Sequence, residues 1–414
     1  MTRLESATSA ITHQKEWFSQ LREQVAAGSP FALVNADAPQ EILRAMGIPY
    51  VVNQWWASVI GAKQQAEPSL TAIAALGYPD YSRQYDAVAF GAMSLPAGDA
   101  PWGGLPRPDI VLAENSGDST QKVFELWTED PATAFFRFER TAADPAPSRW
   151  WELVPREWET VFGTDRIDLM AAENRLLISF LEERTGRTFK MDRLVTVMSL
   201  INEHAEFNRK TRDLIARTRP TPVRVNDTIP AVMIPQWHRG SEWGRDAAKR
   251  LFEEVSSLVE GGGSVVPDEK VRLMWIGRGL WNDLALYRRF EEELGAVFVW
   301  SMYLAIAADG YVRYGDDPIR ALAARFVGIT DLLYAPPLAY EWYVKEAMAH
   351  GVDGVVHLVA EDVPGSHFVT TALEAAGIPV LEIHANNADP RSIEASDIGG
   401  RIETFIRERA ARAL

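Results

Sequence analysis

The stretch from Leu105 to Trp127, "LPRPDIVLAENSGDSTQKVFELW", decides the fold. Its apolar run over 109–113 predicts a buried strand, and the residues from Asp118 onward predict a helix. The small polar turn Asn115-Ser116-Gly117-Asp118 separates the two elements. In open α/β proteins such a turn lies where a strand's carboxyl end and a helix's amino end face one crevice, and ligands bind there. The stretch therefore predicts an α/β domain with a ligand site at this turn.

The same alternation of strand and helix extends on both sides of this stretch. Five short apolar runs are predicted to be buried strands: 31–34, 50–53, 87–91, 109–113 and 132–138. A helix between the first two starts after Asp37 and ends at Gly47, residue types that suit a cap at each end. Glu41, in the first turn of that helix, is expected to be favoured by the helix dipole rather than to act as a general base. Alternating strands and helices predict a parallel sheet.

The pattern changes near residue 165 and changes back near residue 266. Between them, three long segments have apolar residues at helical spacing and charged opposite faces. Further strands are then predicted over 271–277, 296–302, 332–335, 354–359 and 379–384. The predicted fold is α/β, with two open parallel-sheet (Rossmann/flavodoxin-like) domains joined by a helical section. The predicted parts are an N-terminal helical segment (1–30), a first α/β domain (31–164), a helical section (165–265) and a second α/β domain (266–414). The two halves do not align residue by residue, so the sequence leaves an internal repeat unproven.

Composition excludes several classes of function. The chain has 414 residues, with 42 Lys and Arg against 57 Asp and Glu, so its net charge is −15. Nucleic acid and anionic membrane surfaces select for clustered Lys and Arg, so neither is expected as a partner. The amino terminus lacks the apolar core of a signal peptide, and the most apolar run, over 296–308, is too short to span a bilayer. The expected location is the cytoplasm.

Five segments of the chain follow, in order and spacing, the signatures of one family. They are "APQEILRAMGIP" (38–49), "PDIVLAENSGDSTQKVFE" (108–125), "DDPIRALAARF" (316–326), the segment from "VDGVVHLVAEDVPGSHF" to "LEIHANNADPR" (352–391) and "RIETFIRE" (401–408). From about residue 28 to 410 the chain resembles a subunit of the 2-hydroxyacyl-CoA dehydratase and benzoyl-CoA reductase family, of the D-component type. The resemblance implies an acyl-CoA (a coenzyme A thioester) as substrate and a second subunit of the same family as partner.

The resemblance also implies a [4Fe-4S] cluster that this chain lacks the ligands to hold. Family members hold one cluster per subunit with cysteines at strand ends, and this chain contains no cysteine. The family's Cys-Asp pair falls on Gly117-Asp118, an earlier cysteine near 77–79 and the last one within 360–365. His357 and His367 flank the last position, but two histidines do not replace a set of thiolates. We therefore expect no metal or cofactor in this chain, with the [4Fe-4S] cluster in a partner subunit.

Residues at predicted strand ends are the candidates for chemistry. Asp37, Ser116, Asp118 and His238 are the candidate catalytic groups. Asp118 or Ser119 can equally cap the helix that follows, and the two roles are compatible. His238 stands in "PQWHRGSEWGRD" (235–246), a segment rich in Trp, His and Arg, although a lone histidine is more often structural.

A second group of residues is predicted to bind the CoA thioester. Its members are Gln54, Trp55, Trp56, Gly117, Ser119, Arg278 and Trp281. The tryptophan pair could stack on an acyl group or an adenine, with core packing as the alternative. Arg278, in a glycine-containing loop after a strand, could meet a CoA phosphate, with a solvated loop arginine as the alternative.

Three functions are compatible with these features. The first is a cluster-free subunit of a heteromeric dehydratase-like lyase, which shapes the acyl-CoA site beside its partner. The second is a stand-alone acyl-CoA hydratase or lyase that uses acid–base chemistry in the vacated cluster site. The third is a non-catalytic module that binds an acyl-CoA or stabilises a partner.

Overall fold

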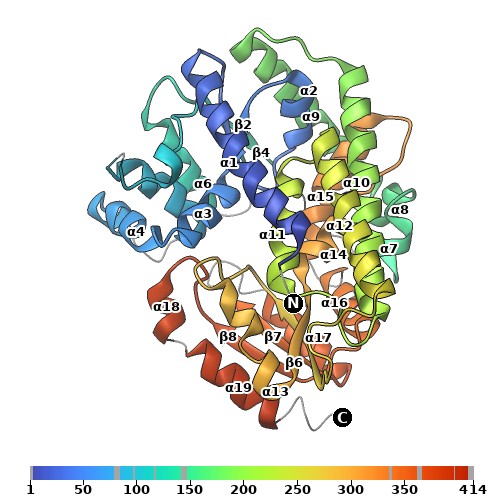
Figure 1. The fold of residues 1–414 in the computed structure, drawn as a ribbon. Helices are drawn as coiled ribbons and strands as arrows, with labels where there is room; N and C mark the ends of the chain where they lie inside the picture. The colour runs from blue at the N-terminus through green and yellow to red at the C-terminus, as the bar shows by residue number, and fades with distance from the viewer. Residues whose placement is uncertain are drawn as a thin grey trace.

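Two parallel sheets and a layer of long helices make up the molecule in a computed structural model. The structure describes residues 3–78, 84–96, 98–115, 118–139, 141, 147–334, 338–360, 366–395 and 397–408. In the view of Figure 1 the amino-terminal sheet and its helices lie at the upper left, the long helices at the right and the carboxyl-terminal sheet at the bottom.

The first sheet, sheet A, has the strand order β2-β1-β3-β4 with every pair parallel. Its strands are β1 (Ala32–Val34), β2 (Tyr50–Val52), β3 (Ile110–Glu114) and β4 (Ala134–Phe138). The two inner strands, β1 and β3, and the edge strand β2 are buried at every residue. This burial explains why they read as continuous apolar runs rather than alternating ones.

The second sheet, sheet B, has the order β6-β5-β7-β8, again with parallel pairs. Its strands are β5 (Val271–Ile276), β6 (Ala296–Ser301), β7 (Gly354–Val359) and β8 (Val380–His384). Numbered within their own half, the strands of both sheets have the order 2-1-3-4. The two halves therefore repeat one topology that their sequences do not reveal, and the predicted fold class is confirmed.

Nineteen helices within the described residues surround the sheets. Those of the first half are α1 (Glu5–Ala26), α2 (Gln40–Met46), α3 (Asn53–Ala62), α4 (Ala66–Ala75), α5 (Gln84–Gly91), α6 (Asp118–Leu126), α7 (Trp150–Leu153) and α8 (Trp158–Phe162). The long helices are α9 (Thr164–Thr185), α10 (Met191–Arg217), α11 (Val225–Trp237) and α12 (Glu242–Glu260). The others are α13 (Glu291–Leu294), α14 (Met302–Asp309), α15 (Pro318–Tyr334), α16 (Leu338–Ala349), α17 (His367–Ala375), α18 (Pro390–Ala395) and α19 (Ile398–Glu408).

Two predicted strands are wrong, and one predicted cap is absent. The run over 87–91 forms the end of α5, and residues 332–334 form the end of α15, while residue 335 lies outside the described residues. A short apolar run does not distinguish a buried helix from a buried strand, and here the helical packing decides. α2 begins with Pro39 at its N-cap and no side-chain cap, so Asp37 does not cap it, whereas Gly47 ends it in the left-handed conformation as predicted.

The helical layer draws on both halves of the chain and shares their core. α14 and α15 pack against α10 and α9, and α1 packs along α11. One hydrophobic cluster includes Leu33 of sheet A, Ile201 of α10 and Val355 of sheet B. This core contains residues from both sides of each predicted domain boundary. The boundaries themselves stay a prediction.

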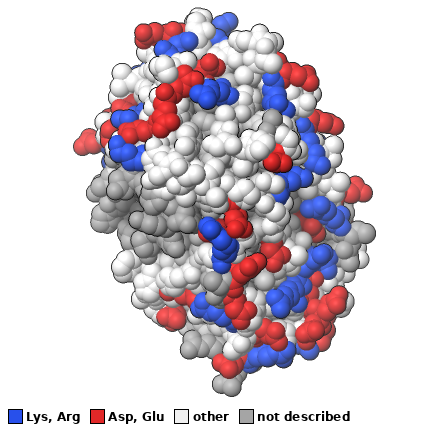
Figure 2. All heavy atoms as spheres, turned by 90° about the vertical axis from the view of Figure 1, so that its left-hand side faces the viewer, with Lys and Arg blue, Asp and Glu red and all other residues white. Residues whose placement is uncertain are grey.

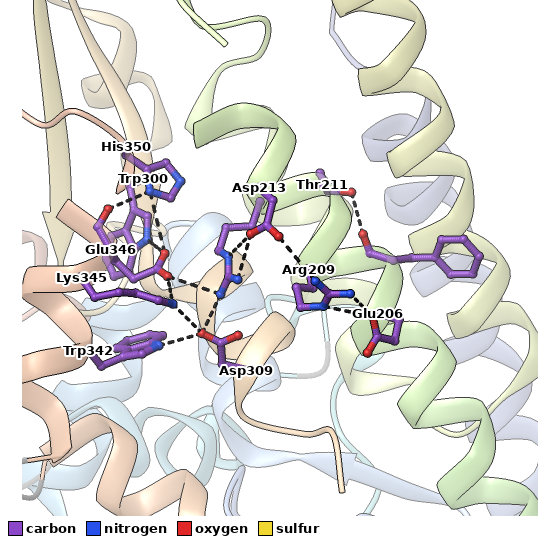
Figure 3. A network of polar contacts seen from close by, with 12 residues as sticks. Glu206, Arg209, Thr211, Asp213, Trp300, Asp309, Trp342, Lys345, Glu346 and His350 are labelled. Atoms are coloured by element: carbon purple, nitrogen blue, oxygen red, sulfur yellow. Dashed lines mark hydrogen bonds and ion pairs between the residues drawn. The ribbon is translucent and has the colours of Figure 1, made fainter. Parts of the chain in front are cut away.

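A buried polar network fastens α10 to α14 and α16 (Figure 3). One carboxylate oxygen of Asp309 lies 2.6 Å from Arg212 Nη1 and 2.9 Å from the Trp342 indole nitrogen, and Lys345 Nζ donates to it from 3.1 Å. Glu346 accepts from the Trp300 indole at 2.7 Å. Two cations thus face two buried carboxylates, and Arg212 also pairs with the half-exposed Asp213, 2.9 Å from its Nη2.

The surface carries both signs of charge. Figure 2, which looks onto the side that carries α4 and α18, shows Lys and Arg interspersed with Asp and Glu around a broad area without charged side chains. Among the helices described, none combines the length and apolar character needed to cross a bilayer.

Candidate functional site

The carboxyl end of sheet A carries a compact set of polar side chains. Asn35 follows β1, and Gln54 lies at the start of α3, which follows β2. The Gln54 amide donates to Asn35 Oδ1 at 2.5 Å and to Asp86 Oδ1 at 2.9 Å, and its oxygen accepts from the Ala36 backbone at 2.8 Å. β1 and β3 are the strands at which the order reverses, so this set lies where α/β sheets commonly bind ligands.

The loop that follows β5 meets this set from the other sheet. The Arg278 guanidinium lies 5.2 Å from the centre of the Tyr85 ring, and the Tyr85 hydroxyl donates to the Gln54 carbonyl at 2.8 Å. Burial raises the pKa of Tyr85 well above its ordinary value, with Tyr303 adding to the shift and Arg278 opposing it. At neutral pH this phenol is therefore neutral and can donate a hydrogen bond.

Further contacts hold the two loop regions together. The Gly279 backbone donates to the Tyr303 hydroxyl at 2.6 Å, and the Trp281 ring lies 5.6 Å from the Tyr303 ring. The Gln64 amide donates to the Asn282 carbonyl at 3.0 Å. We call the residues around Gln54, Tyr85, Arg278, Trp281 and Tyr303 the inter-sheet junction. It brings Gln54, Arg278 and Trp281 of the predicted binding residues into one region.

Trp55 and Trp56 are directed away from the junction and into the core. They are 3% and 1% exposed, and they pack with Phe18 and Trp102 at ring distances of 4.9 to 6.4 Å. The Trp55 indole donates to Gln14 of α1 at 3.2 Å. These contacts correspond to the core-packing alternative, and a stacking role in ligand binding stays a prediction.

His238 lies near the amino end of strand β2, away from the carboxyl ends of the strands that carry Asn35 and Gln54. It follows α11, and the preceding residue, Trp237, accepts at 3.4 Å from the hydroxyl of Tyr50, the first residue of β2. Its ring packs edge-on against Trp17 at 4.6 Å and His13 at 5.0 Å. Burial lowers the pKa of His238 well below its ordinary value, with Arg44 and His13 adding to the shift. The structure does not bring His238 together with the inter-sheet junction.

Part of the predicted site lies outside what the structure describes. Ser116 and Gly117 are among the residues not described. Asp118 and Ser119 begin α6, whose side chains at these positions are not described either, so a capping or ligand role is not tested. Asp37 is partly buried in the loop between β1 and α2. Burial raises the pKa of Tyr311, and the charge of Asp37 raises it further.

Strands β7 and β8 of sheet B, together with α17, carry a chain of hydrogen-bonded side chains that the sequence did not predict. His357 of β7 is fully buried, and its Nδ1 lies 2.8 Å from the Thr370 hydroxyl of α17. That hydroxyl donates to Glu382 of β8 at 2.7 Å. Glu382 also contacts His367 at 2.7 Å and His384 at 3.3 Å, both of which are exposed. We call these five residues the His357 relay. A histidine inside the otherwise apolar strand "GVVHLV" is the signal that could have identified it.

The relay determines which nitrogen of His357 carries the proton. Burial would raise the pKa of Glu382, but hydrogen bonds from Thr370 and His367 outweigh it and lower the pKa, so the carboxylate is ionised. Since the single Thr370 proton goes to Glu382, Nδ1 of His357 must donate to Thr370. Nε2 is then a bare acceptor, and it is buried with no hydrogen-bond partner among the described residues. Burial lowers the pKa of His357 to about 4, so at neutral pH the ring is an uncharged base.

Comparison with known proteins identifies the family. Residues 35–408 match the family model for the 2-hydroxyglutaryl-CoA dehydratase D-component. The chain belongs to this family. The expectation drawn from the sequence signatures is thereby confirmed.

Two relatives are alpha subunits of acyl-CoA dehydratases by name. The chain is 23% identical over 372 residues to the (R)-phenyllactyl-CoA dehydratase alpha subunit of Clostridium sporogenes, a match that covers 88% of this chain and 86% of the relative. It is 21% identical over 277 residues to the (R)-2-hydroxyisocaproyl-CoA dehydratase alpha subunit of Clostridioides difficile, which covers 62% of this chain and 67% of the relative.

The residues present do not fit the iron–sulfur cluster expected of a D-component. The sequence contains no cysteine, so it supplies no thiolate. Within the described part of the chain, no group of three His, Asp or Glu side chains is arranged to hold a metal ion. In the His357 relay, Nδ1 is already bonded to Thr370. This chain therefore lacks the thiolates that the family resemblance implies for the cluster.

Proposed function

We propose that this chain is a cluster-free subunit of a heteromeric acyl-CoA-processing lyase of the dehydratase type. In this proposal it shapes the acyl-CoA site, and a second subunit of the same family supplies the [4Fe-4S] cluster. The observation that carries the proposal is a family match over residues 35–408 in a chain without a single cysteine. The expected location is the cytoplasm, on the sequence argument given above.

The inter-sheet junction supports a CoA thioester as the ligand. It combines a guanidinium, Arg278, with aromatic rings and a neutral phenol, Tyr85. Guanidinium groups bind phosphates through paired N–H donors, and aromatic rings provide flat apolar contact for an acyl chain or an adenine. We assign Arg278 to a CoA phosphate and Trp281 to the apolar part of the thioester.

The charge-poor face in Figure 2 supports a partner subunit. α4 lies on this side of the molecule and ends beside two exposed side chains, Leu76 at 54% and Tyr78 at 37% exposure. Interface cores are depleted in charge and enriched in aromatic residues. A permanent complex commonly buries more than about 2,000 Å² of surface in total. In this proposal the charge-poor face forms part of that buried area.

Co-expression tests the subunit proposal. The chain is produced with a cysteine-bearing member of the same family, and the complex is analysed by size-exclusion chromatography with mass detection and iron determination. We expect a stable heteromer with iron only in the presence of the partner. The chain alone, reconstituted anaerobically with iron and sulfide, should take up no stoichiometric iron. A four-iron stoichiometry in the isolated chain contradicts the proposal.

Replacement of Arg278 by Met tests the CoA site directly. Losing a hydrogen bond to a charged group costs about 1.5 to 3 kcal/mol, so the affinity of the assembled complex for coenzyme A should fall roughly tenfold to a hundredfold. Arg217→Met, at an exposed position of α10, is the matched control and should leave the affinity unchanged. Isothermal titration calorimetry with coenzyme A measures both. An unchanged affinity in the Arg278 variant would place the phosphates elsewhere.

One observation favours the second candidate, a hydratase or lyase that acts alone. The bare, buried Nε2 of His357, backed by Thr370 and Glu382, is an uncharged nitrogen that can accept a proton or a hydrogen bond from a ligand. If the isolated chain turns over a 2-hydroxyacyl-CoA or an enoyl-CoA, and His357→Gln abolishes the turnover without unfolding the protein, this candidate replaces the first. No turnover by the isolated chain leaves the subunit proposal in place.

A further inference from the structure

Three buried arginines meet where α2, α15 and the segments after α11 and α14 come together. Arg239 is 3% exposed, Arg313 1% and Arg325 2%. Arg239 Nε and Arg325 Nη1 donate to the same oxygen of Glu41, at 2.8 and 3.0 Å. We call these four residues the arginine cluster. Three guanidinium groups in it face one carboxylate.

Arg313 belongs to the segment before α15, and its guanidinium lies against the face of α15 that carries Arg325 and Gly328. Gly328 is three residues after Arg325, so the two positions are neighbours on the helix surface. A Cβ atom added at Gly328 would lie 2.4 Å from Arg313 Nη2 and 2.7 Å from the Phe162 ring. The guanidinium of Arg313 therefore fills the space that a side chain at position 328 would occupy. The glycine makes room for it.

Several donors in the cluster have no acceptor. Arg313 Nη1 donates to the Val312 carbonyl at 2.6 Å, and Arg325 Nε donates to the Tyr311 carbonyl at 2.8 Å. Among the described residues, no partner is found for Arg313 Nε and Nη2, Arg325 Nη2 or Arg239 Nη1. These donors belong to side chains that are almost completely removed from solvent.

An unpaired buried guanidinium needs a compensating anion. A buried lysine can release its proton, but arginine stays charged in proteins. An isolated buried charge costs several kcal/mol, which is why buried charges are paired. Asp309 is a carboxylate that acts on Arg313, and its bonded oxygen is already shared by Arg212, Lys345 and Trp342. The protein groups described here do not supply the missing negative charge.

We propose that the arginine cluster binds a small oxyanion, a carboxylate or phosphate group, between Arg313 and Arg325. The unpaired Nε and Nη2 of Arg313 form a planar fork that matches the paired oxygens of such a group, and Arg325 Nη2 adds one further donor, which selects an oxyanion over a spherical ion. Glu41 holds Arg239 and Arg325 in place without neutralising Arg313. This site is separate from the inter-sheet junction and from the proposed dehydratase chemistry.

A groove borders the arginine cluster on the side of Arg313. Arg313 lines a cavity of about 440 Å³ between α10 and the segment that leads into α15, together with Asn202, Lys210 and Tyr314. Glu203 and Glu206 share its rim with Lys210, so the rim itself does not select for anions. Arg313 is the member of the arginine cluster that lines this cavity, so selection for an anion would come from its guanidinium.

Thermal unfolding of the full chain with inorganic phosphate tests the proposal. A ligand that binds only the folded state raises the Tm in a saturable way. We expect phosphate, at constant ionic strength, to raise the Tm of the natural protein by a few degrees with saturation. Arg313→Met, which keeps the volume and removes the fork, should retain only the small unsaturated effect that phosphate has on proteins in general. Arg217→Met, at an exposed position, should respond as the natural protein does.

Direct binding distinguishes the remaining outcomes. Calorimetry should give one phosphate per chain, with acetate competing and chloride at the same concentration not competing. If Arg313→Met does not fold, Arg313→Lys serves instead, since it keeps the charge without the fork and should weaken phosphate binding at least tenfold. Equal Tm responses in the natural protein and the Arg313 variant overturn the site. Saturation by chloride alone overturns the oxyanion assignment.

Discussion

Glu41 is the single carboxylate between two buried arginines, Arg239 and Arg325. Removing one partner of a buried ion pair leaves uncompensated charge, which typically costs about 3 to 5 kcal/mol. Glu41→Gln should therefore lower the free energy of unfolding at pH 7 by about that amount, measured by urea denaturation. Glu23→Gln, at an exposed position of α1, should change it by less than about 0.5 kcal/mol. An equal effect of the two substitutions would contradict this role of Glu41.

The same carboxylate predicts a loss of stability in acid. Burial would raise the pKa of Glu41, but Arg239 and Arg325 outweigh it and lower the pKa from 4.5 to about 2. A depressed carboxylate pKa stabilises the folded state above the unfolded value, and this contribution is lost as the pH falls through the folded value. The difference in unfolding free energy between the natural protein and Glu41→Gln should thus be constant above pH 5 and shrink from pH 4.5 downward. A difference that does not vary with pH would contradict the assignment.

His357 predicts a pH dependence in a different range. Its pKa falls from 6.5 to about 4 because the ring is buried, so the unfolded chain binds a proton more readily than the folded one between these values. The free energy of unfolding should therefore rise with pH from about 4 to 6.5. His204 and His238 shift in the same direction, so His357→Gln should reduce this slope rather than remove it. Arg217→Met, at an exposed position of α10, is the control and should leave the slope nearly unchanged.

For single residues, the sequence predicts where a polar side chain lies in an element better than it predicts the residues to which that side chain bonds. The polar turn residues and Glu41 could be placed at the ends of strands and helices, because caps and loops have local signals. The partners of Glu41 lie 198 and 284 residues away along the chain, and Thr370 lies 13 residues from His357 in another element. No local pattern determines such pairs. They arise only when the sheets and helices are assembled.

α5 illustrates how packing determines an element that the sequence leaves ambiguous. Its run Ala87–Gly91 is apolar, and Gly91 lies against α4 so closely that an added Cβ atom would be 2.1 Å from the Ser69 carbonyl oxygen. Gly91→Ala should force α4 and α5 apart and destabilise the protein by about 1 to 3 kcal/mol. Gly98→Ala, where an added Cβ meets nothing within 4 Å, should be close to neutral. Urea unfolding of both variants measures this, and a neutral Gly91→Ala would show that the helices separate freely.

The sequence predicts every strand that forms in the two sheets, but it also predicts two strands that do not form. Each inner strand is a short run of apolar residues, and eight of ten predicted strands form. The two failures, at 87–91 and 332–334, are also apolar but end helices that are packed on other helices. Apolar character reports burial, whereas strand or helix geometry depends on the neighbours. The sequence alone could not separate the two.

At the scale of the molecule, the sequence predicts two sheets and a helical section but not how they share a core. The sequence predicts the helical section as a separate part, yet α14 and α15 of the second half pack onto it. One hydrophobic cluster then continues from sheet A through the helices to sheet B. Such continuity depends on long-range contacts, which periodicity does not report.

A continuous core predicts a single cooperative unfolding transition. Far-ultraviolet circular dichroism reports the helices, and fluorescence reports the 14 tryptophans, which occur in all parts of the chain. The two signals should change together in urea, as expected when no partly folded state is populated. Independent unfolding of the predicted parts would instead give separate transitions, and that result would contradict a shared core.

The polar network in Figure 3 provides the variant that tests this coupling. Asp309 joins Arg212 of α10 to Lys345 and Trp342 of α16 through one oxygen. Asp309→Asn leaves these cations without their shared charge, so the unfolding free energy should fall by about 3 to 5 kcal/mol. Asp268→Asn, at a side chain that is 88% exposed, is the control and should change it by less than about 0.5 kcal/mol. Because the core remains continuous, the Asp309 variant should still unfold in one transition at a lower urea concentration. A variant in which the helices melt before the tryptophan signal changes would show that this network, rather than the apolar core, couples the two halves.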